Sequence, residues 1–195
     1  MASEQPPSAA IEQRVVAVER VLEVRARDAG VSVDATIEAL EEAFLADNGA
    51  RVVARAWTDP DFRRRLLADG KATVAELGIP LTPVQRQLYV LENTPEVHNV
   101  IVCTLCSCSA MTLIGPQPDW YKDLEYRARV VRQSRTVLKE MGLELPAEIE
   151  IRVWDTTADT RFMVLPMQPP ETIGWPEDKL SSIVTRDSLI GVARL

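Results

Sequence analysis

Apolar residues at spacings of three and four dominate the first part of the chain, after a polar start that contains two Pro residues. We predict that residues 1–7 are disordered, because they lack this spacing. A first amphipathic helix is expected from about Ser8 to Gly30, with an apolar face made of Ile11, Val15, Val18 and Leu22. A second helix should begin at the capping residue Asp34 and end at Asn48 and Gly49. Its apolar face would consist of Ile37, Leu40, Phe44 and Leu45.

Further helices are predicted after this point. Asp59 is a capping acid followed by Pro60, whose missing N–H costs nothing at the first helical position. This helix should end at Gly70, and another short helix should end near Gly78. The segment from Ile79 to Gln87 contains two Pro residues and is expected to be a loop.

The pattern then changes to short runs that are rich in β-branched residues. Tyr89–Leu91 and Val97–Val102 are predicted to be strands, and the second leads directly into a cluster of Cys residues. Gly115, Pro116 and Pro118 mark the loop that follows this cluster.

The remaining elements are expected to alternate between helices and strands. A long helical region is predicted over about Asp119–Met141, with Gly142 as its end, and a further helix over Glu177–Val184. Strict alternation predicts a half-buried strand over Glu148–Trp154. Further strands are predicted over Arg161–Leu165 and Ser188–Val192. The order of elements indicates a helical N-terminal arm over residues 8–48 and an α+β domain over residues 49–195.

The composition narrows the range of partners. Of 195 residues, 46% are hydrophobic and 26% charged, which is ordinary for a globular protein. The net charge of −7 and the lack of a long basic run argue against binding to nucleic acid or to an anionic membrane surface. No stretch approaches the roughly 18–20 apolar residues of a membrane span. Because the N-terminus also lacks a secretory pattern, we expect a cytoplasmic protein.

The three Cys residues lie within six positions, at Cys103, Cys106 and Cys108. An odd number cannot form a closed set of disulfides. A structural zinc site and an iron–sulfur cluster both usually need four protein ligands. The single His, His98, lies five residues before Cys103, and an odd separation on a strand puts the two side chains on opposite faces. His98 is therefore a poor fourth ligand.

Three other interpretations of the cluster remain. A redox-active Cys-x-x-Cys pair expects a strand–helix setting and leaves the third Cys unexplained. Three buried Cys acting as small hydrophobic residues would not explain their clustering. In the third interpretation, one tight turn binds a single transition metal through three thiolates. Strong thiolate donors favour an inert trivalent ion, and backbone nitrogens between the last two Cys could also reach it.

The segment Cys103-Thr104-Leu105-Cys106-Ser107-Cys108 resembles the metal-binding motif of nitrile hydratase α subunits. The resemblance extends over nearly the whole domain. Flanking segments that resemble the family are Ala50–Trp57, Leu66–Gly70, Leu91–Thr94, Val97–Val100, Asp119–Lys122, Tyr126–Arg127 and Val184–Arg186.

This resemblance implies a metal centre at the Cys cluster. The three sulfurs and the backbone nitrogens of Ser107 and Cys108 would hold the metal, with Cys106 as sulfinic acid and Cys108 as sulfenic acid. Thr104 is typical of cobalt-type members, so non-corrin Co(III) is expected before iron. The implied catalytic residues are Cys106, Ser107 and Cys108.

The resemblance also implies a fold and partners. The fold would be a layered α/β/β/α domain preceded by a helical arm that wraps a β-type subunit. Arginines of that subunit would contact the oxidised Cys residues. The other expected partners are a metal-loading activator protein and a small-molecule nitrile.

The implied activity is the hydration of a nitrile to an amide. The metal could act as a Lewis acid on the nitrile nitrogen or lower the pKa of water, or the sulfenate oxygen of Cys108 could attack the nitrile carbon. The rival assignments are the related metal-binding subunit of thiocyanate hydrolase and a non-enzymatic metal-carrying or redox module.

Positions around the expected pocket are assigned by the same resemblance. Gln85 matches a Gln near the pocket, with Gln87 as its alternative, and Arg161 matches an Arg in a network that reaches the partner. Asp159 stands where Glu is common. Met111 stands where the family commonly has Trp, which suggests a bulkier or unusual nitrile, such as a heterocyclic one.

Overall fold

The computed structural model describes residues 9–35, 37–38, 47–79, 81, 86–106 and 108–195. The chain is divided into two compact units, residues 1–42 and residues 43–195. The expected boundary between residues 48 and 49 stays a prediction. Among the described residues, no helix has the length and apolar character that crossing a membrane requires.

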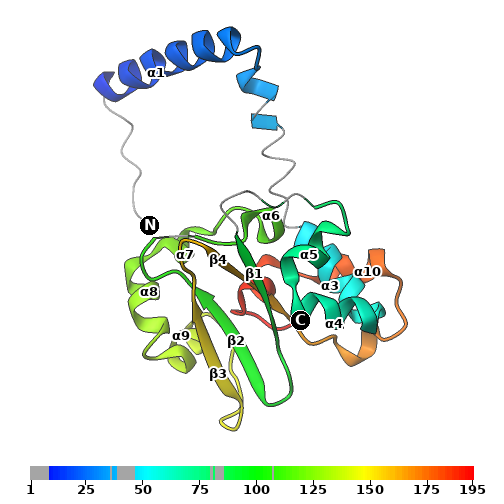
Figure 1. The fold of residues 1–195 in the computed structure, drawn as a ribbon. Coiled ribbons are helices and arrows are strands. Elements are labelled where there is room, and N and C mark those ends of the chain that lie inside the picture. The colour runs from blue at the N-terminus through cyan, green and yellow to red at the C-terminus, as the bar shows by residue number, and fades with distance from the viewer. Residues whose placement is uncertain (1–8, 36, 39–46, 80, 82–85, 107) are drawn as a thin grey trace. The chain divides into compact units, whose positions relative to one another are not determined.

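The first unit contains helix α1, Ala9–Asp28, which confirms the first predicted helix (Figure 1). Gly30 adopts a φ of +68° just after it. The predicted apolar face is about half exposed. The exposed fraction is 49–58% for each of its four residues, Ile11, Val15, Val18 and Leu22. Residues 33–35 and 37–38 are helical. Leu40, Phe44 and Leu45 lie outside the described residues.

The second unit begins with helix α3, Asp47–Thr58, so the prediction that Asn48 and Gly49 end a helix is wrong. Both residues lie in the first turn of α3. A Cβ at Gly49 would come within 2.5 Å of the Leu113 carbonyl oxygen, so this glycine serves close packing. Helix α4, Pro60–Ala68, begins as predicted, because the Asp59 carboxylate accepts hydrogen bonds from two backbone N–H groups of its first turn. Helix α5, Gly70–Ala75, follows directly.

Within the described residues, four strands form two parallel pairs. Strand β1, Gln87–Glu92, pairs with β4, Thr160–Leu165. Strand β2, Val97–Val102, pairs with β3, Glu150–Asp155. All four were predicted from the sequence. Parallel neighbours need a crossover connection, and helices α6 to α9 provide it between β2 and β3.

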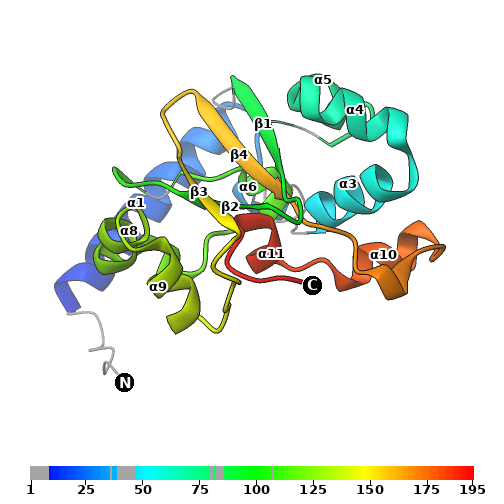
Figure 2. The same ribbon diagram turned by 90° about the horizontal axis from the view of Figure 1, so that it is seen from below.

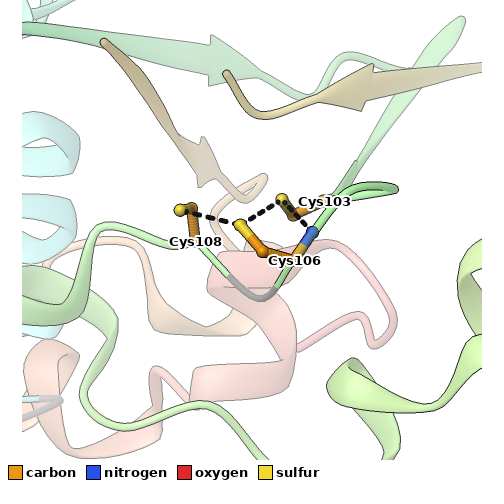
Figure 3. Close-up of side chains that lie close together, drawn as sticks. All are labelled: Cys103, Cys106 and Cys108. Carbon is orange, nitrogen blue, oxygen red and sulfur yellow. Dashed lines mark hydrogen bonds between the residues drawn. The ribbon is translucent and has the colours of Figure 1, made fainter. Parts of the chain in front are cut away.

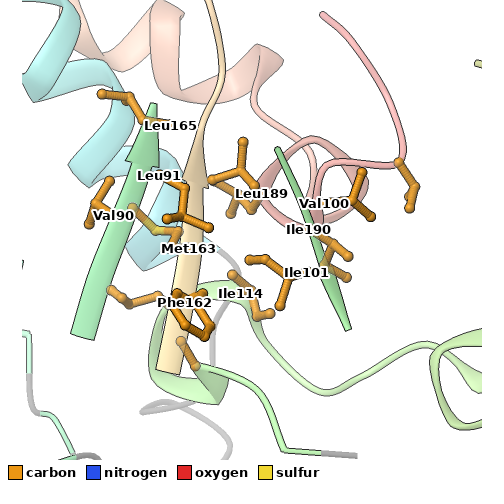
Figure 4. Close-up of a cluster of buried hydrophobic side chains, with 14 of the residues drawn as sticks. Val90, Leu91, Val100, Ile101, Ile114, Phe162, Met163, Leu165, Leu189 and Ile190 are labelled. Atoms are coloured by element: carbon orange, nitrogen blue, oxygen red, sulfur yellow. The ribbon is translucent and has the colours of Figure 1, made fainter. Parts of the chain in front are cut away.

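The two sheets are packed between helices (Figure 2). Helices α4 and α5 contact β1 on one side, while α9 contacts β3 on the other. Between the sheets, β2 contacts β4, and helix α11, Arg186–Ile190, contacts both strands. This arrangement agrees with an α/β/β/α order and confirms the α+β class. Figure 4 shows the core where these elements meet, lined by Leu91, Val100, Ile101, Ile114, Met163, Leu165, Leu189 and Ile190.

The predicted helical region over Asp119–Met141 is present, but it is divided into three helices. The segment forms α7, Asp119–Lys122, then α8, Leu124–Val130, and α9, Ser134–Glu140. Asp123 separates the first two, because its backbone is extended and its carboxylate accepts a 2.6 Å hydrogen bond from the Glu125 N–H. A side chain that caps a new helix in this way ends the previous one.

The strand predicted over Ser188–Val192 is also wrong, because this segment contributes to helix α11. Thr185 and Ser188 form a reciprocal capping box at its start, and Gly191 ends it with a φ of +92°. The other helical elements are α6, Met111–Ile114, the short 3₁₀ helix Pro170–Thr172, and α10, Glu177–Ile183, which confirms the last predicted helix.

Candidate metal centre

Strand β2 delivers the first Cys of the cluster. Val100, Ile101 and Val102 are buried, and Cys103 follows them with 1% of its surface exposed. Thr156 continues the β2–β3 pairing by donating to the Val102 carbonyl through its N–H at 2.8 Å and its hydroxyl at 3.0 Å. Cys103 is therefore fixed by the end of a buried sheet.

The turn after β2 brings the three sulfurs together (Figure 3). The Sγ atoms of Cys103 and Cys106 lie 3.3 Å apart, and those of Cys106 and Cys108 lie 3.0 Å apart. All three lie within 4.8 Å of one another. The three side chains differ in burial, because Cys103 is buried, Cys106 is exposed and Cys108 is partly exposed. Three sulfur donors thus converge on one point at the surface of the unit.

Neighbouring elements anchor the turn through its backbone. The Asp155 carboxylate, at the end of β3, accepts hydrogen bonds from the Thr104 N–H at 2.9 Å and from its hydroxyl at 2.5 Å. Arg127 on α8 donates to the Cys106 carbonyl at 2.7 Å. Tyr121 on α7 donates to the Cys108 carbonyl at 3.2 Å. Three elements distant in sequence therefore hold one short turn.

The electrostatics of the sulfurs favour a cation. The hydrogen bond with Cys106 and partial burial raise the pKa of the Cys108 thiol to about 11, although the charge of Arg161 acts in the opposite direction. Negative charges on three sulfurs this close together would repel one another, and a bound cation would offset that repulsion. A bound metal ion supplies that charge and deprotonates coordinating thiols. The donor set therefore fits a thiolate-bound transition metal.

His98 takes no part in this cluster, as predicted from its spacing. Its side chain is fully buried, with one ring nitrogen 2.8 Å from the Gly191 carbonyl oxygen and the other 3.3 Å from the Asn93 amide. Burial lowers the pKa of His98. Its role is to connect β2 with the end of α11.

The other predicted site residues lie in different parts of the chain, and some of them lie outside the described residues. Ser107 and Gln85 lie outside the described residues. Gln87 is exposed at the start of β1, and its amide oxygen lies 3.3 Å from the Tyr89 hydroxyl. Met111 is half-buried and begins α6, three residues after Cys108.

Asp159 lies in the turn between β3 and β4, and Arg161 lies at the start of β4. Arg161 is buried and donates to the carbonyls of Thr157, Ala158 and Thr160 at 2.6–3.2 Å. It lies close enough to Cys108 for its charge to act on that thiol. The Asp159 side chain is exposed and pairs with Arg86 at 3.4 Å. The structure thus brings Arg161, but not the Asp159 carboxylate, toward the cluster, and the roles of both residues stay predictions.

Sequence reasoning missed the residues that anchor the turn, namely Tyr121, Arg127, Asp155 and Thr156. Tyr121 and Arg127 lie in flanking segments that resemble the nitrile hydratase family, which was the available signal. Nothing in the local pattern around Asp155 distinguishes it from any other charged residue at a strand end.

Comparisons with known proteins agree with this geometry. The family model described as "Nitrile hydratase, alpha chain" matches residues 9–193. The cobalt-containing nitrile hydratase subunit alpha of Pseudonocardia thermophila is 44% identical, over 93% of this chain and 91% of the relative. The thiocyanate hydrolase subunit gamma of Thiobacillus thioparus is 44% identical, over 74% of this chain and 63% of the relative. Among solved structures, a double mutant of the Fe-type nitrile hydratase from Comamonas testosteroni Ni1 has a TM-score of 0.85 and 54% identity, covering 97% of this chain and 92% of that one.

Proposed function

The chain belongs to the nitrile hydratase α-chain family, and from this premise we propose that it holds a Co(III) ion with which its complex hydrates a bulky nitrile to the amide. Enzymes of this family add water to a nitrile and work as complexes of α and β subunits. The observation that carries the proposal is the convergence of three sulfur atoms within 4.8 Å on one turn.

The proposed ligands are the sulfurs of Cys103, Cys106 and Cys108 and the backbone nitrogens of Ser107 and Cys108. When bound, the trivalent ion supplies a Lewis acid for the nitrile nitrogen. Thr104 is the residue typical of cobalt-type members, and the relative from Pseudonocardia thermophila is named as cobalt-containing. The similarity to an Fe-type enzyme makes iron the alternative that metal analysis must exclude.

We propose that Cys106 is oxidised to the sulfinic acid and Cys108 to the sulfenic acid. The exposure of Cys106 leaves its oxygens accessible to arginines of a β-type subunit, which would form charge-assisted hydrogen bonds with them. Leu105, beside it, keeps 88% of its surface exposed, which favours a covering partner. Metal loading would use an activator protein.

Cys108 is the proposed nucleophile. The oxygen of its sulfenate attacks the nitrile carbon, and water then restores the sulfenate oxygen, supplies the protons and releases the amide. A single turnover in ¹⁸O-labelled water should therefore give an amide without the label, because its oxygen comes from Cys108. Label in the first product would show instead that a water oxygen attacks the nitrile directly.

The proposal about the substrate rests on Met111. Met111 begins α6, three residues after Cys108, and a flexible Met where the family commonly has a rigid Trp would leave more room in the pocket. We propose that the pocket accepts heterocyclic or other bulky nitriles. A higher kcat/KM for small aliphatic nitriles than for bulky ones would contradict this proposal.

The test uses the chain coexpressed with its β-type partner and activator. Elemental analysis should find cobalt, and the mass of the Cys103–Cys108 peptide should rise by about three oxygen atoms, for one sulfinate and one sulfenate. Assays with nitriles and with thiocyanate then separate nitrile hydratase from thiocyanate hydrolase activity. A complex that binds cobalt but converts neither substrate would favour a metal-carrying module.

A further inference from the structure

Arg127 makes the contact on which this inference rests. It lies in helix α8, 21 residues after Cys106, and its Nη1 atom donates a 2.7 Å hydrogen bond to the Cys106 carbonyl oxygen. A guanidinium forms stronger hydrogen bonds than a neutral donor. This bond therefore connects a charged group on a helix to the middle of the proposed metal-binding turn.

Part of the Arg127 guanidinium is buried. Its Nε atom has no solvent exposure and no hydrogen-bond partner within the described part of the chain. Burying a charged donor is costly unless its hydrogen bonds are satisfied. The Nη1 bond to the turn satisfies another donor of the same guanidinium and fixes this partly buried charge against the turn, which suggests a role beyond that of a surface charge.

The Cys106 carbonyl oxygen belongs to the same peptide group as the backbone nitrogen of Ser107. If that nitrogen is a metal ligand, as proposed above, it would bind after losing its proton to the solvent, and the resulting negative charge would be shared with the carbonyl oxygen through amide resonance. A guanidinium on that oxygen then stabilises the metal-bound form of the peptide group directly. The sulfurs of Cys103, Cys106 and Cys108 would add further negative charge nearby when they bind a metal. The positive charge of the Arg127 guanidinium would also stabilise this charge.

We propose that Arg127 is a positioning residue for metal loading, which holds the Cys106 carbonyl and stabilises the loaded turn. This inference rests on the proposed function. Residues of this kind, which support metal ligands without binding the metal, commonly change metal affinity by about 10- to 100-fold when they are removed.

The test compares variants in the αβ complex, purified from cells grown at graded cobalt concentrations. Arg127→Met should raise the cobalt concentration needed for half occupancy by about 10- to 100-fold. Arg127→Lys keeps the charge and should have a smaller effect, while Arg127→Gln keeps a donor without the charge and should lie between Lys and Met. The readouts are the cobalt-to-protein ratio and the intensity of the sulfur-to-metal charge-transfer absorption.

Arg129→Met is the matched control on the same helix. Arg129 forms ion pairs with Glu125 and Glu140 at 3.2 and 2.7 Å, so its removal also costs α8 an arginine and its contacts. This variant should load cobalt like the wild type. Equal shifts in the Arg127→Met and Arg129→Met variants would overturn the inference, because they would show a general effect on the helix.

Three further outcomes keep the test decisive. If Arg127→Met does not accumulate, identical loading of the Lys and Gln variants would refute a role for the charge. A wild-type complex that takes up no cobalt would refute the proposed function itself. Normal loading of both the wild type and Arg127→Met would refute only the inference about Arg127.

Discussion

Replacing Gly191 by Ala should destabilise the domain that carries the metal site. Gly191 ends α11 with a φ of +92°, a conformation that L residues rarely adopt. A Cβ at this position would lie 2.0 Å from the Asn99 carbonyl oxygen and 3.1 Å from the Val100 Cα. Both atoms belong to the backbone of buried strand β2, so the clash cannot be relieved by turning a side chain.

The magnitude has two parts. Forcing Ala into the left-handed region costs about 1–2 kcal/mol. Overpacking against a fixed backbone costs about 1–3 kcal/mol more. The expected loss in the free energy of unfolding is therefore about 2–5 kcal/mol, which corresponds to a fall in Tm of about 4–20 °C for a domain of this size. Movement of residue 191 away from β2 should also weaken the 2.8 Å hydrogen bond between His98 and the carbonyl oxygen of this residue.

Gly142→Ala provides the matched control. Gly142 has a φ of +95°, yet a Cβ there would meet nothing within 4 Å. This variant should lose only the left-handed component, about 1–2 kcal/mol or roughly 2–8 °C in Tm. Thermal unfolding of both variants should be followed at one protein concentration, because assembly shifts the apparent stability. If Gly191→Ala lowered Tm no more than Gly142→Ala, the close approach of α11 to β2 would be refuted.

Three further predictions address the metal site and its surroundings. Asp155→Ala removes the acceptor of two Thr104 hydrogen bonds and should raise the cobalt concentration for half occupancy by about tenfold. The control variant, Glu150→Ala on the same strand, should bind cobalt like the wild type. Because burial lowers the pKa of His98 below its usual 6.5, the unfolded chain gains this proton first. Stability should therefore fall as the pH drops from 7 through 6.5, by at most about 1.4 kcal/mol per pH unit for this group, and denaturant titrations should show a weaker pH dependence for His98→Gln. Met111→Trp should shift the ratio of kcat/KM values toward small nitriles by about tenfold or more, and an unchanged ratio would remove Met111 from the pocket.

The elements that could be predicted are those whose signals are local. Asp59 and Pro60 mark a helix start through groups that lie within one turn of it. Strand β2 was predicted with its observed bounds, because a run of β-branched residues between turns has few alternatives. Gly142 closes α9 through its own backbone conformation. In each case the residues that decide the structure are neighbours in the sequence.

The errors arise where the sequence pattern is consistent with two local structures. A short apolar run such as Leu189-Ile190 is consistent with either a buried strand or a buried helix. The capping box of Thr185 and Ser188 selects the helix, and its second member is Ser where Glu or Gln is the usual signal. Gly49 resembled a helix end, but the nearby Leu113 carbonyl explains it. The same residue types therefore had two structural meanings, which an unusual capping box separated in the first case and packing in the second.

The proposed metal centre divides in the same way. Its sulfur ligands could be found from the sequence, because one tight turn supplies all three within six residues. Its supports could not, since Arg127 is 21 residues from Cys106 and Asp155 is 51 residues from Thr104. A ligand motif determines which atoms can bind a metal, whereas the helix and strand behind it determine how firmly the turn is held. Substitutions at Arg127 or Asp155 should therefore change cobalt occupancy while leaving all three sulfur ligands in place, which separates the strength of the site from its identity.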